Sequence, residues 1–142
     1  MRLLVDTNVY LEHLLNREKS EVSRAFFKCA LYRKNQILIT SMSLRDIEYI
    51  YLKKSHDKEL TRKMRVGIYS MVYKVISTTA DAAIESLYNN DSRDYEDSLQ
   101  MIAAEESMCD AIITFYTKDF ESSKIPVFTP EEILNIWKKT AD

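Results

Sequence analysis

Short apolar runs alternate along the chain with longer segments in which apolar residues recur at helical spacing. Four runs are short enough to be buried strands, and a fifth, which contains Pro126, is typical of a strand at the edge of a sheet. The five predicted strands cover residues 3–5, 37–39, 75–76, 111–114 and 125–128.

Helices are predicted between these strands. After Ser20, apolar residues at positions 22, 25, 26, 29 and 30 form one continuous stripe on a helix. Ser43 followed by Asp46 resembles a helix N-cap with an acid three residues later, and Thr129 followed by Pro130 marks the start of a final helix. The other predicted helices cover residues 9–15, 57–73, 80–88 and 94–107, with a loop at 89–92.

This alternation of strands and helices predicts an α/β fold, in which helices cover both faces of a mainly parallel sheet. A length of 142 residues favours one domain that spans residues 1–142.

Composition narrows the class of protein. Hydrophobic residues make up 46% of the chain and charged residues 30%, which excludes a disordered, collagen-like or disulfide-rich protein. Cys29 and Cys109 lie among apolar residues and are interpreted as reduced thiols. The apolar run at residues 3–5 is too short for a signal peptide, and no apolar run reaches about 18 residues, so we expect a soluble cytoplasmic protein without a membrane segment.

The net charge of −2 argues against a protein that coats nucleic acid through a general basic excess. With a single glycine, the chain also offers no glycine-rich phosphate loop. Any chemistry must therefore come from side chains.

Aspartates gather where the predicted strands and helices meet. Asp6 and Asp119 follow predicted strands, and Asp46 is expected in the first turn of the helix after the second strand. Asp94 and Asp97 lie three residues apart, on one face of a predicted helix. Ligands of parallel α/β sheets bind at the carboxyl ends of the strands. The five acids are therefore expected to meet at that edge.

Carboxylates a few ångströms apart repel one another unless a positive group lies among them. Magnesium and manganese prefer oxygen ligands and act on phosphates, by activating water and by stabilising the leaving oxygen. The acids therefore favour a divalent metal site that hydrolyses phosphodiesters.

Each acid also has a purely structural interpretation. Asp6 can cap the helix that follows it, and Asp46 fits the third position of a capping box. Asp94 can be an N-cap with Asp97 as its capping-box partner. Asp119 can close a turn just before Phe120. The combined pattern is more specific than any single member.

Four segments carry a family resemblance, in order along the whole chain: LLVDTNV at 3–9, DYEDSLQ at 94–100, TFYTKDF at 114–120 and PVFTPE at 126–131. Together they resemble the PIN-domain family, especially its VapC-type toxin ribonucleases. The resemblance implies a three-layer sandwich with a central parallel sheet, and acids that bind Mg²⁺ or Mn²⁺ and cleave RNA.

Matched motif by motif, Asp6 resembles the first acid of the family, Asp97 the third and Asp119 the fourth. The second is a carboxylate in the helix after the second strand, where Asp46 fits better than Glu48. Two residues two positions apart point about 200° away from each other on a helix, so only one of these two can face the site. We choose Asp46 as the catalytic residue and keep Glu48 as a supporting residue.

One segment departs from the family pattern. Many relatives have Thr-Arg-Asn where this chain has Thr114, Phe115 and Tyr116, so a cation and an amide are missing near the acids. We expect the metal site to persist, with Asp94 as a further ligand and with Asn8 and Thr114 as polar support behind the ligands. Contacts with the substrate are expected to differ.

A basic stretch at residues 53–65 contains six lysines and arginines against two acids. It is a candidate for binding RNA phosphates beside the acids, and otherwise a solvated helix face. The candidate contacts are Lys53, Lys54, Lys58, Arg62 and Lys63. The resemblance also implies a homodimer and a small antitoxin protein as a partner.

The leading prediction is a Mg²⁺- or Mn²⁺-dependent endoribonuclease, the toxin of a type II toxin–antitoxin pair. A phosphatase that forms an aspartyl phosphate on Asp6 is a second class, but such enzymes have an Asp two positions later, where this chain has Asn8. A third interpretation is a PIN-like RNA-binding or regulatory module without turnover, which the altered Phe115 and Tyr116 keep open.

Overall fold

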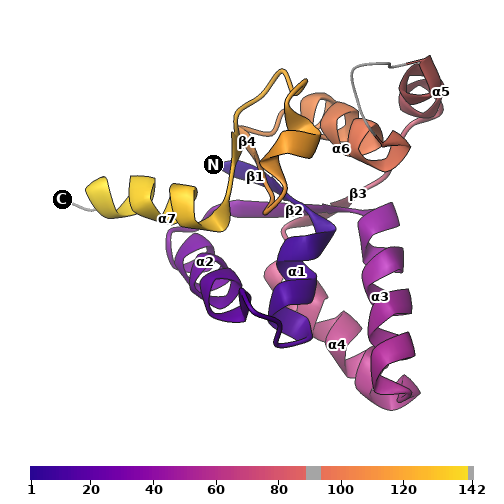
Figure 1. The fold of residues 1–142 in the computed structure, drawn as a ribbon, viewed down its shortest axis with the longest axis vertical. Helices are drawn as coiled ribbons and strands as arrows, with labels where there is room; N and C mark the ends of the chain where they lie inside the picture. Colours follow the sequence, from indigo (N-terminus) through magenta and orange to yellow (C-terminus); the bar gives the residue numbers. More distant parts are fainter. Residues whose placement is uncertain (89–93, 141–142) are drawn as a thin grey trace.

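The computed structural model describes residues 1–88 and 94–140, and the loop predicted at 89–92 lies outside this part (Figure 1). The described strands form one parallel sheet in the order β3-β2-β1-β4-β5. They are β1 (Arg2–Val5), β2 (Gln36–Thr40), β3 (Lys74–Ile76), β4 (Ala111–Ile113) and β5 (Val127–Phe128). The α/β prediction is confirmed, and the sheet of the described residues is entirely parallel.

Helices connect these strands in chain order. They are α1 (Thr7–Leu14), α2 (Ser20–Tyr32), α3 (Ser41–Ser55), α4 (Lys58–Met71), α5 (Ala80–Tyr88), α6 (Tyr95–Glu106), a short 3-10 helix η1 (Thr117–Phe120) and α7 (Pro130–Lys139). The predicted proline at the start of α7 is confirmed, and Thr129 forms a full capping box there with Glu132.

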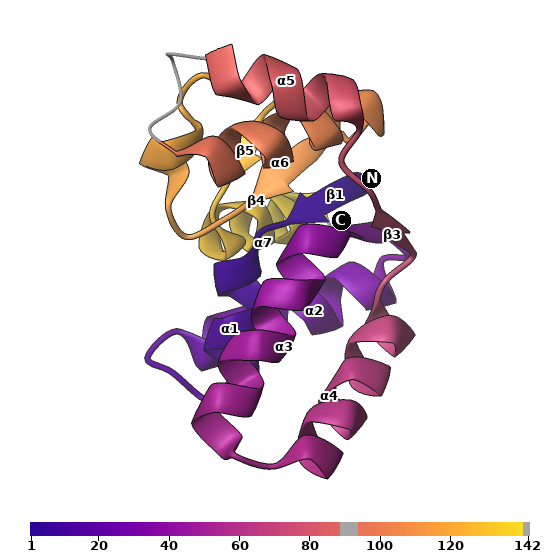
Figure 2. The same ribbon diagram turned by 90° about the vertical axis from the view of Figure 1, so that its right-hand side faces the viewer.

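Alternating side chains of the strands divide the interior into two layers. Leu3 and Val5 of β1 pack with buried residues of α1, α2, α3, α4 and α7, whereas Leu4 packs with residues of α6 and with Phe120 of η1. Helix α5 lies outside α6 and packs on it (Figure 2). The sheet is therefore the middle layer of three, as the family resemblance implied.

Two helices begin directly at the carboxyl ends of β1 and β2. Asp6 caps α1 by accepting a hydrogen bond from the backbone N–H of Thr7, and Thr40 caps α3 by accepting one from Ser43. The predicted N-cap at Ser43 is therefore wrong. Because Thr40 already turns the chain at the end of its strand, Ser43 lies inside the first turn and Asp46 lies in the second turn of α3.

Cys29 and Cys109 are both free thiols, as predicted. Among residues 1–88 and 94–140, no helix is both long enough and apolar enough to cross a membrane.

Candidate active site

Asp6 lies at the carboxyl end of β1 and is only 5% exposed. Its Oδ1 accepts hydrogen bonds from the backbone N–H of Thr7 at 2.7 Å and from Nε2 of Gln100 at 2.8 Å. Its Oδ2 accepts hydrogen bonds from the hydroxyl of Thr114 at 2.8 Å and from Nδ2 of Asn8. Four donors from three separate parts of the chain therefore fix the orientation of this carboxylate.

Asn8 and Thr114 also tie the end of β4 to the end of β1. The backbone N–H of Phe115 donates to Oδ1 of Asn8 at 3.1 Å, and that of Tyr116 donates to Oγ1 of Thr114 at 3.1 Å. Each of the two side chains thus contacts Asp6 on one side and the backbone after β4 on the other.

Two further acids come from the first turn of α6. Asp94 is the N-cap of this helix and accepts a hydrogen bond from the backbone N–H of Glu96 at 3.0 Å. Asp97 lies in the same turn and is half-buried. Burial raises the pKa of Asp97 to about 7, with contributions from the negative charges of Asp6, Asp94, Asp119 and Glu96.

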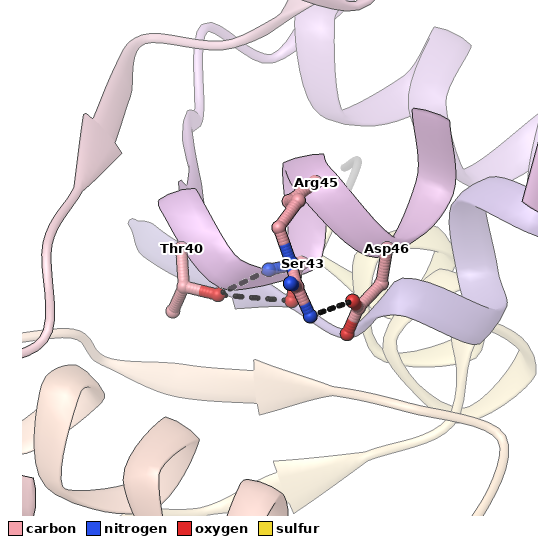
Figure 3. A network of polar contacts seen from close by, with 4 residues as sticks. All are labelled: Thr40, Ser43, Arg45 and Asp46. Atoms are coloured by element: carbon pink, nitrogen blue, oxygen red, sulfur yellow. Dashed lines mark hydrogen bonds and ion pairs between the residues drawn. The ribbon is translucent and has the colours of Figure 1, made fainter. Parts of the chain in front are cut away.

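Glu96 joins this group to Asp46 of α3. Burial raises the pKa of Glu96, and so do the charges of Asp46, Asp6 and Asp94 and a hydrogen bond with the Asp46 side chain. Asp46 in turn forms an ion pair at 3.2 Å with its highly exposed neighbour Arg45 (Figure 3). Six carboxyl groups are thus linked through their effects on Glu96 and Asp97, and we call them the acidic cluster: Asp6, Asp46, Asp94, Glu96, Asp97 and Asp119.

Glu48 points elsewhere. It forms a bidentate ion pair with Arg65 of α4, with Oε2 3.0 Å from Nε. Of the two candidate acids on α3, the structure therefore brings Asp46 to the acidic cluster, whereas Glu48 links α3 to α4.

The segment that departs from the family pattern has a lysine beside it. Nζ of Lys19, the residue before α2, lies 4.7 Å from the centre of the Phe115 ring. Phe115 is bonded through its backbone to Asn8, a neighbour of Asp6. A positive charge is therefore present beside Phe115 even though position 115 does not itself supply one.

The acidic cluster is only partly arranged for metal binding. Within the described ranges, no three His, Cys, Asp or Glu side chains are grouped closely enough to hold a metal ion as they stand. The donor chemistry nevertheless suits a hard divalent cation, because every member of the acidic cluster offers oxygen, and burial together with like charges raises the pKa of Asp97.

The basic stretch lies at the far end of the hairpin formed by α3 and α4. Lys53 and Lys54 are in the last turn of α3, and Lys53 is about 10 Å further along the helix than Asp46. Arg62 of α4 is paired with Glu59 at 2.9 Å. The structure thus separates these cations from the acidic cluster, beside which they were candidates for binding phosphates.

Sequence reasoning missed Glu96 and Gln100. Glu96 adjoins Asp97, so that both fall in the first turn of α6, and Gln100 lies three residues after Asp97 on the same face of the helix. The spacing was visible in the sequence, but a glutamine among apolar residues carries no signal of its own.

Comparison with known proteins identifies the fold family. A family model described as PIN domain matches residues 2–118. The chain belongs to the PIN domain family. Members of this family are generally nucleases that use divalent metal ions. A comparison with curated proteins finds no match.

Three solved structures share this PIN fold at low sequence identity. FitAB bound to an IR36 DNA fragment matches with a TM-score of 0.71 and 15% identity, over 90% of this chain and 94% of the other. VapBC2 from Rickettsia felis, bound to a promoter DNA fragment, matches with a TM-score of 0.70 and 16% identity, over 91% of this chain and 98% of the other. VapC20 from Mycobacterium tuberculosis, a toxin that cleaves the sarcin-ricin loop, matches with a TM-score of 0.58 and 11% identity, over 78% of this chain and 86% of the other.

Proposed function

We propose that this PIN domain is a metal-dependent endoribonuclease that hydrolyses RNA phosphodiester bonds at its acidic cluster. The observation that carries the proposal is the gathering of Asp6, at the end of β1, with acids of α6 and η1 around Asp97, whose pKa is raised to about 7 by burial and by these charges. A cluster of this kind is costly without a counter-charge, and Mg²⁺ or Mn²⁺ supplies it.

Asp6, Asp97 and Asp119 would hold the ion together with Asp94, and Asp46 would complete the catalytic set through Glu96. A bound ion would supply activation of water and stabilisation of the leaving oxygen. Asn8 and Thr114 hold the carboxylate of Asp6 in one orientation through hydrogen bonds on Oδ2. Their support matters because the orientation of a ligand largely determines metal affinity.

RNA would reach the acidic cluster with help from two sources of positive charge. Lys19 lies beside Phe115, and the basic stretch offers Lys53, Lys54, Lys58, Arg62 and Lys63. Phosphate contacts of this kind supply affinity without reading sequence.

We further propose that the protein is the toxin of a type II pair, with a small antitoxin as partner and a homodimer as the assembly. Support comes from the similar folds of FitAB and VapBC2, which are complexes bound to DNA. A neighbouring reading frame that encodes a small DNA-binding protein, and its co-purification with this chain as one complex, are the expected results. A monomeric protein whose gene has no neighbouring reading frame for a small DNA-binding protein would contradict the proposed toxin–antitoxin pair.

The test of the nuclease is cleavage of single-stranded RNA by the full chain with Mg²⁺ or Mn²⁺, and with EDTA as the metal-free control. Asp6→Asn and Asp97→Asn are expected to lose about a hundredfold or more of the rate. Glu18→Gln, an exposed acid outside the acidic cluster, is the matched control. Full activity in either aspartate variant, or in EDTA, would contradict the proposal.

A second candidate function is an RNA-binding module without turnover. It is favoured by Phe115 and Tyr116 in place of the usual polar pair, and by the lack of a ready three-residue ligand group in the described part of the chain. Calorimetric titration with Mn²⁺ separates the two, because RNA binding without any Mn²⁺ binding favours the module.

A further inference from the structure

Gln100 is a buried amide on an otherwise apolar part of α6. It is 1% exposed, and its neighbours Leu99, Met101 and Ile102 belong to the hydrophobic core. Burying an amide costs free energy unless hydrogen bonds replace those to water. A polar side chain at this position therefore needs an explanation.

The hydrogen bonds of Gln100 give that explanation only in part. Nε2 donates to Oδ1 of Asp6 at 2.8 Å, whereas Oε1 is buried without a partner among the described residues. Asp6 is ninety-four residues away in the sequence, on another element. The amide is thus buried for a single bond, and that bond is to the acid at the end of β1.

This bond differs from the other three on Asp6. The donors Thr7 and Asn8 belong to the chain that immediately follows Asp6, and Thr114 follows β4, which pairs with β1. Gln100 alone among these donors belongs to α6, the helix that carries Glu96 and Asp97. It lies three residues after Asp97 and so on the same helix face.

We propose that Gln100 is a positioning residue that fixes the carboxylate of Asp6 relative to the acids of α6. Without this bond, Oδ1 would retain only the N–H of its own neighbour, and the distance between Asp6 and Asp97 would depend on packing alone. The inference rests on the proposed function, since it assigns to Gln100 an effect on metal binding by Asp6.

The test replaces the amide by an apolar side chain of similar length. Gln100→Met removes the donor to Asp6 and also the unpartnered Oε1, so the thermal midpoint is expected to change little. The dissociation constant for Mn²⁺, measured by calorimetry at pH 8, is expected to rise about tenfold or more, as for other residues that orient metal ligands. A purely structural role of Gln100 would not change this constant in a folded protein.

Two further variants sharpen the result. Gln100→Leu repeats the experiment with a different shape in case Gln100→Met packs poorly, and the same rise is expected. Met101 is the next residue and is also buried, so Met101→Leu is the matched control that leaves the bond to Asp6 in place and is expected to keep the original constant.

Three outcomes separate this inference from the proposed function. An unchanged or lower dissociation constant in folded Gln100→Met and Gln100→Leu, with Mn²⁺ binding and RNA cleavage intact in the unsubstituted chain, would overturn the role of Gln100 alone. No binding of Mn²⁺ by the unsubstituted chain would overturn the proposed metal-dependent nuclease, and the role of Gln100 with it. A tenfold rise in both variants but not in Met101→Leu supports both.

Discussion

The acidic cluster and the hairpin of α3 and α4 are held in place in different ways. At the edge of the sheet, Asp6 is 5% exposed and accepts four hydrogen bonds. In the hairpin, the Glu48–Arg65 ion pair joins side chains that are 34% and 43% exposed. A buried carboxylate with several partners is fixed far more firmly than a pair in contact with water.

The difference indicates a division of labour between precise chemistry and general attraction. Groups that act on a scissile bond must be held to within a fraction of an ångström, whereas cations that attract a polyanion act over several ångströms. The rigid sheet edge suits the first task and the exposed hairpin suits the second. Four predictions test this comparison.

The largest effect is expected at Thr114, which is fully buried between Asp6 and Tyr116. Thr114→Val keeps the shape and removes the hydroxyl, so RNA cleavage and Mn²⁺ affinity should fall by about ten- to a hundredfold. The control is Thr61→Val, which also removes a buried hydroxyl bond but lies on α4, and which should leave cleavage unchanged. Equal losses of RNA cleavage and Mn²⁺ affinity in both variants would contradict a special role of the sheet edge.

A smaller effect is expected from the hairpin cations. Changing Lys53, Lys54, Lys58 and Lys63 together to Gln should weaken RNA binding by about tenfold at low salt. It should also flatten the salt dependence, by roughly 0.7 in the logarithmic slope for each phosphate that is no longer neutralised. The control is a variant with the same net charge, in which four lysines outside the hairpin are changed to Gln: Lys28, Lys34, Lys138 and Lys139. If the control weakens binding equally, the attraction belongs to net charge rather than to the hairpin.

The third prediction concerns stability without metal. Because the folded-state pKa of Asp97 is about 7 against 3.8 as the ordinary value, the folded state binds more protons between these values. The contribution of the Asp97 carboxyl group to the free energy of unfolding is therefore present at low pH and is lost as the pH rises through about 7. Asp97→Asn should raise the free energy of unfolding at pH 8 by about 1 kcal/mol more than at pH 5, a figure reduced for partial exposure.

Urea denaturation in EDTA at the two pH values measures this difference. Glu18→Gln serves as the reference, because this exposed acid lies outside the acidic cluster and its substitution should have the same small effect at both. A stability difference for Asp97→Asn that does not depend on pH would show that the pKa of Asp97 is not raised in the folded chain.

The smallest effect is expected in the ion pair of the hairpin. Glu48→Gln should lower the free energy of unfolding by less than about 1 kcal/mol, because both side chains are partly exposed. The decrease should shrink further in high salt. A loss of several kcal/mol would mean that the hairpin is held as firmly as the sheet edge.

The sequence could predict the elements that depend on local pattern. Apolar runs such as residues 111–113 mark strands because both faces of a parallel sheet are covered, and Asp6 follows from the rule that ligands meet at strand ends. The start of α3 was misplaced because Thr40 and Ser43 are both good capping residues. Only the end of the strand, which tertiary pairing fixes, decides between them.

Contacts between distant elements were beyond the sequence. Nothing local distinguishes Gln100 from an exposed helix position, and its burial against Asp6 follows from how α6 packs on the sheet. The basic stretch was a candidate for contacts beside the acids because of its local excess of positive charge. The length of α3 carries it away, since each residue adds about 1.5 Å.

The caps at Asp6, Thr40 and Asp94 have one more consequence. Helices α1, α3 and α6 all begin at the edge where the carboxylates gather. The amino end of each helix carries a partial positive charge of about half a unit from its aligned peptide dipoles. The backbone itself thus supplies a share of the countercharge that makes so dense a group of anions tolerable in the folded chain.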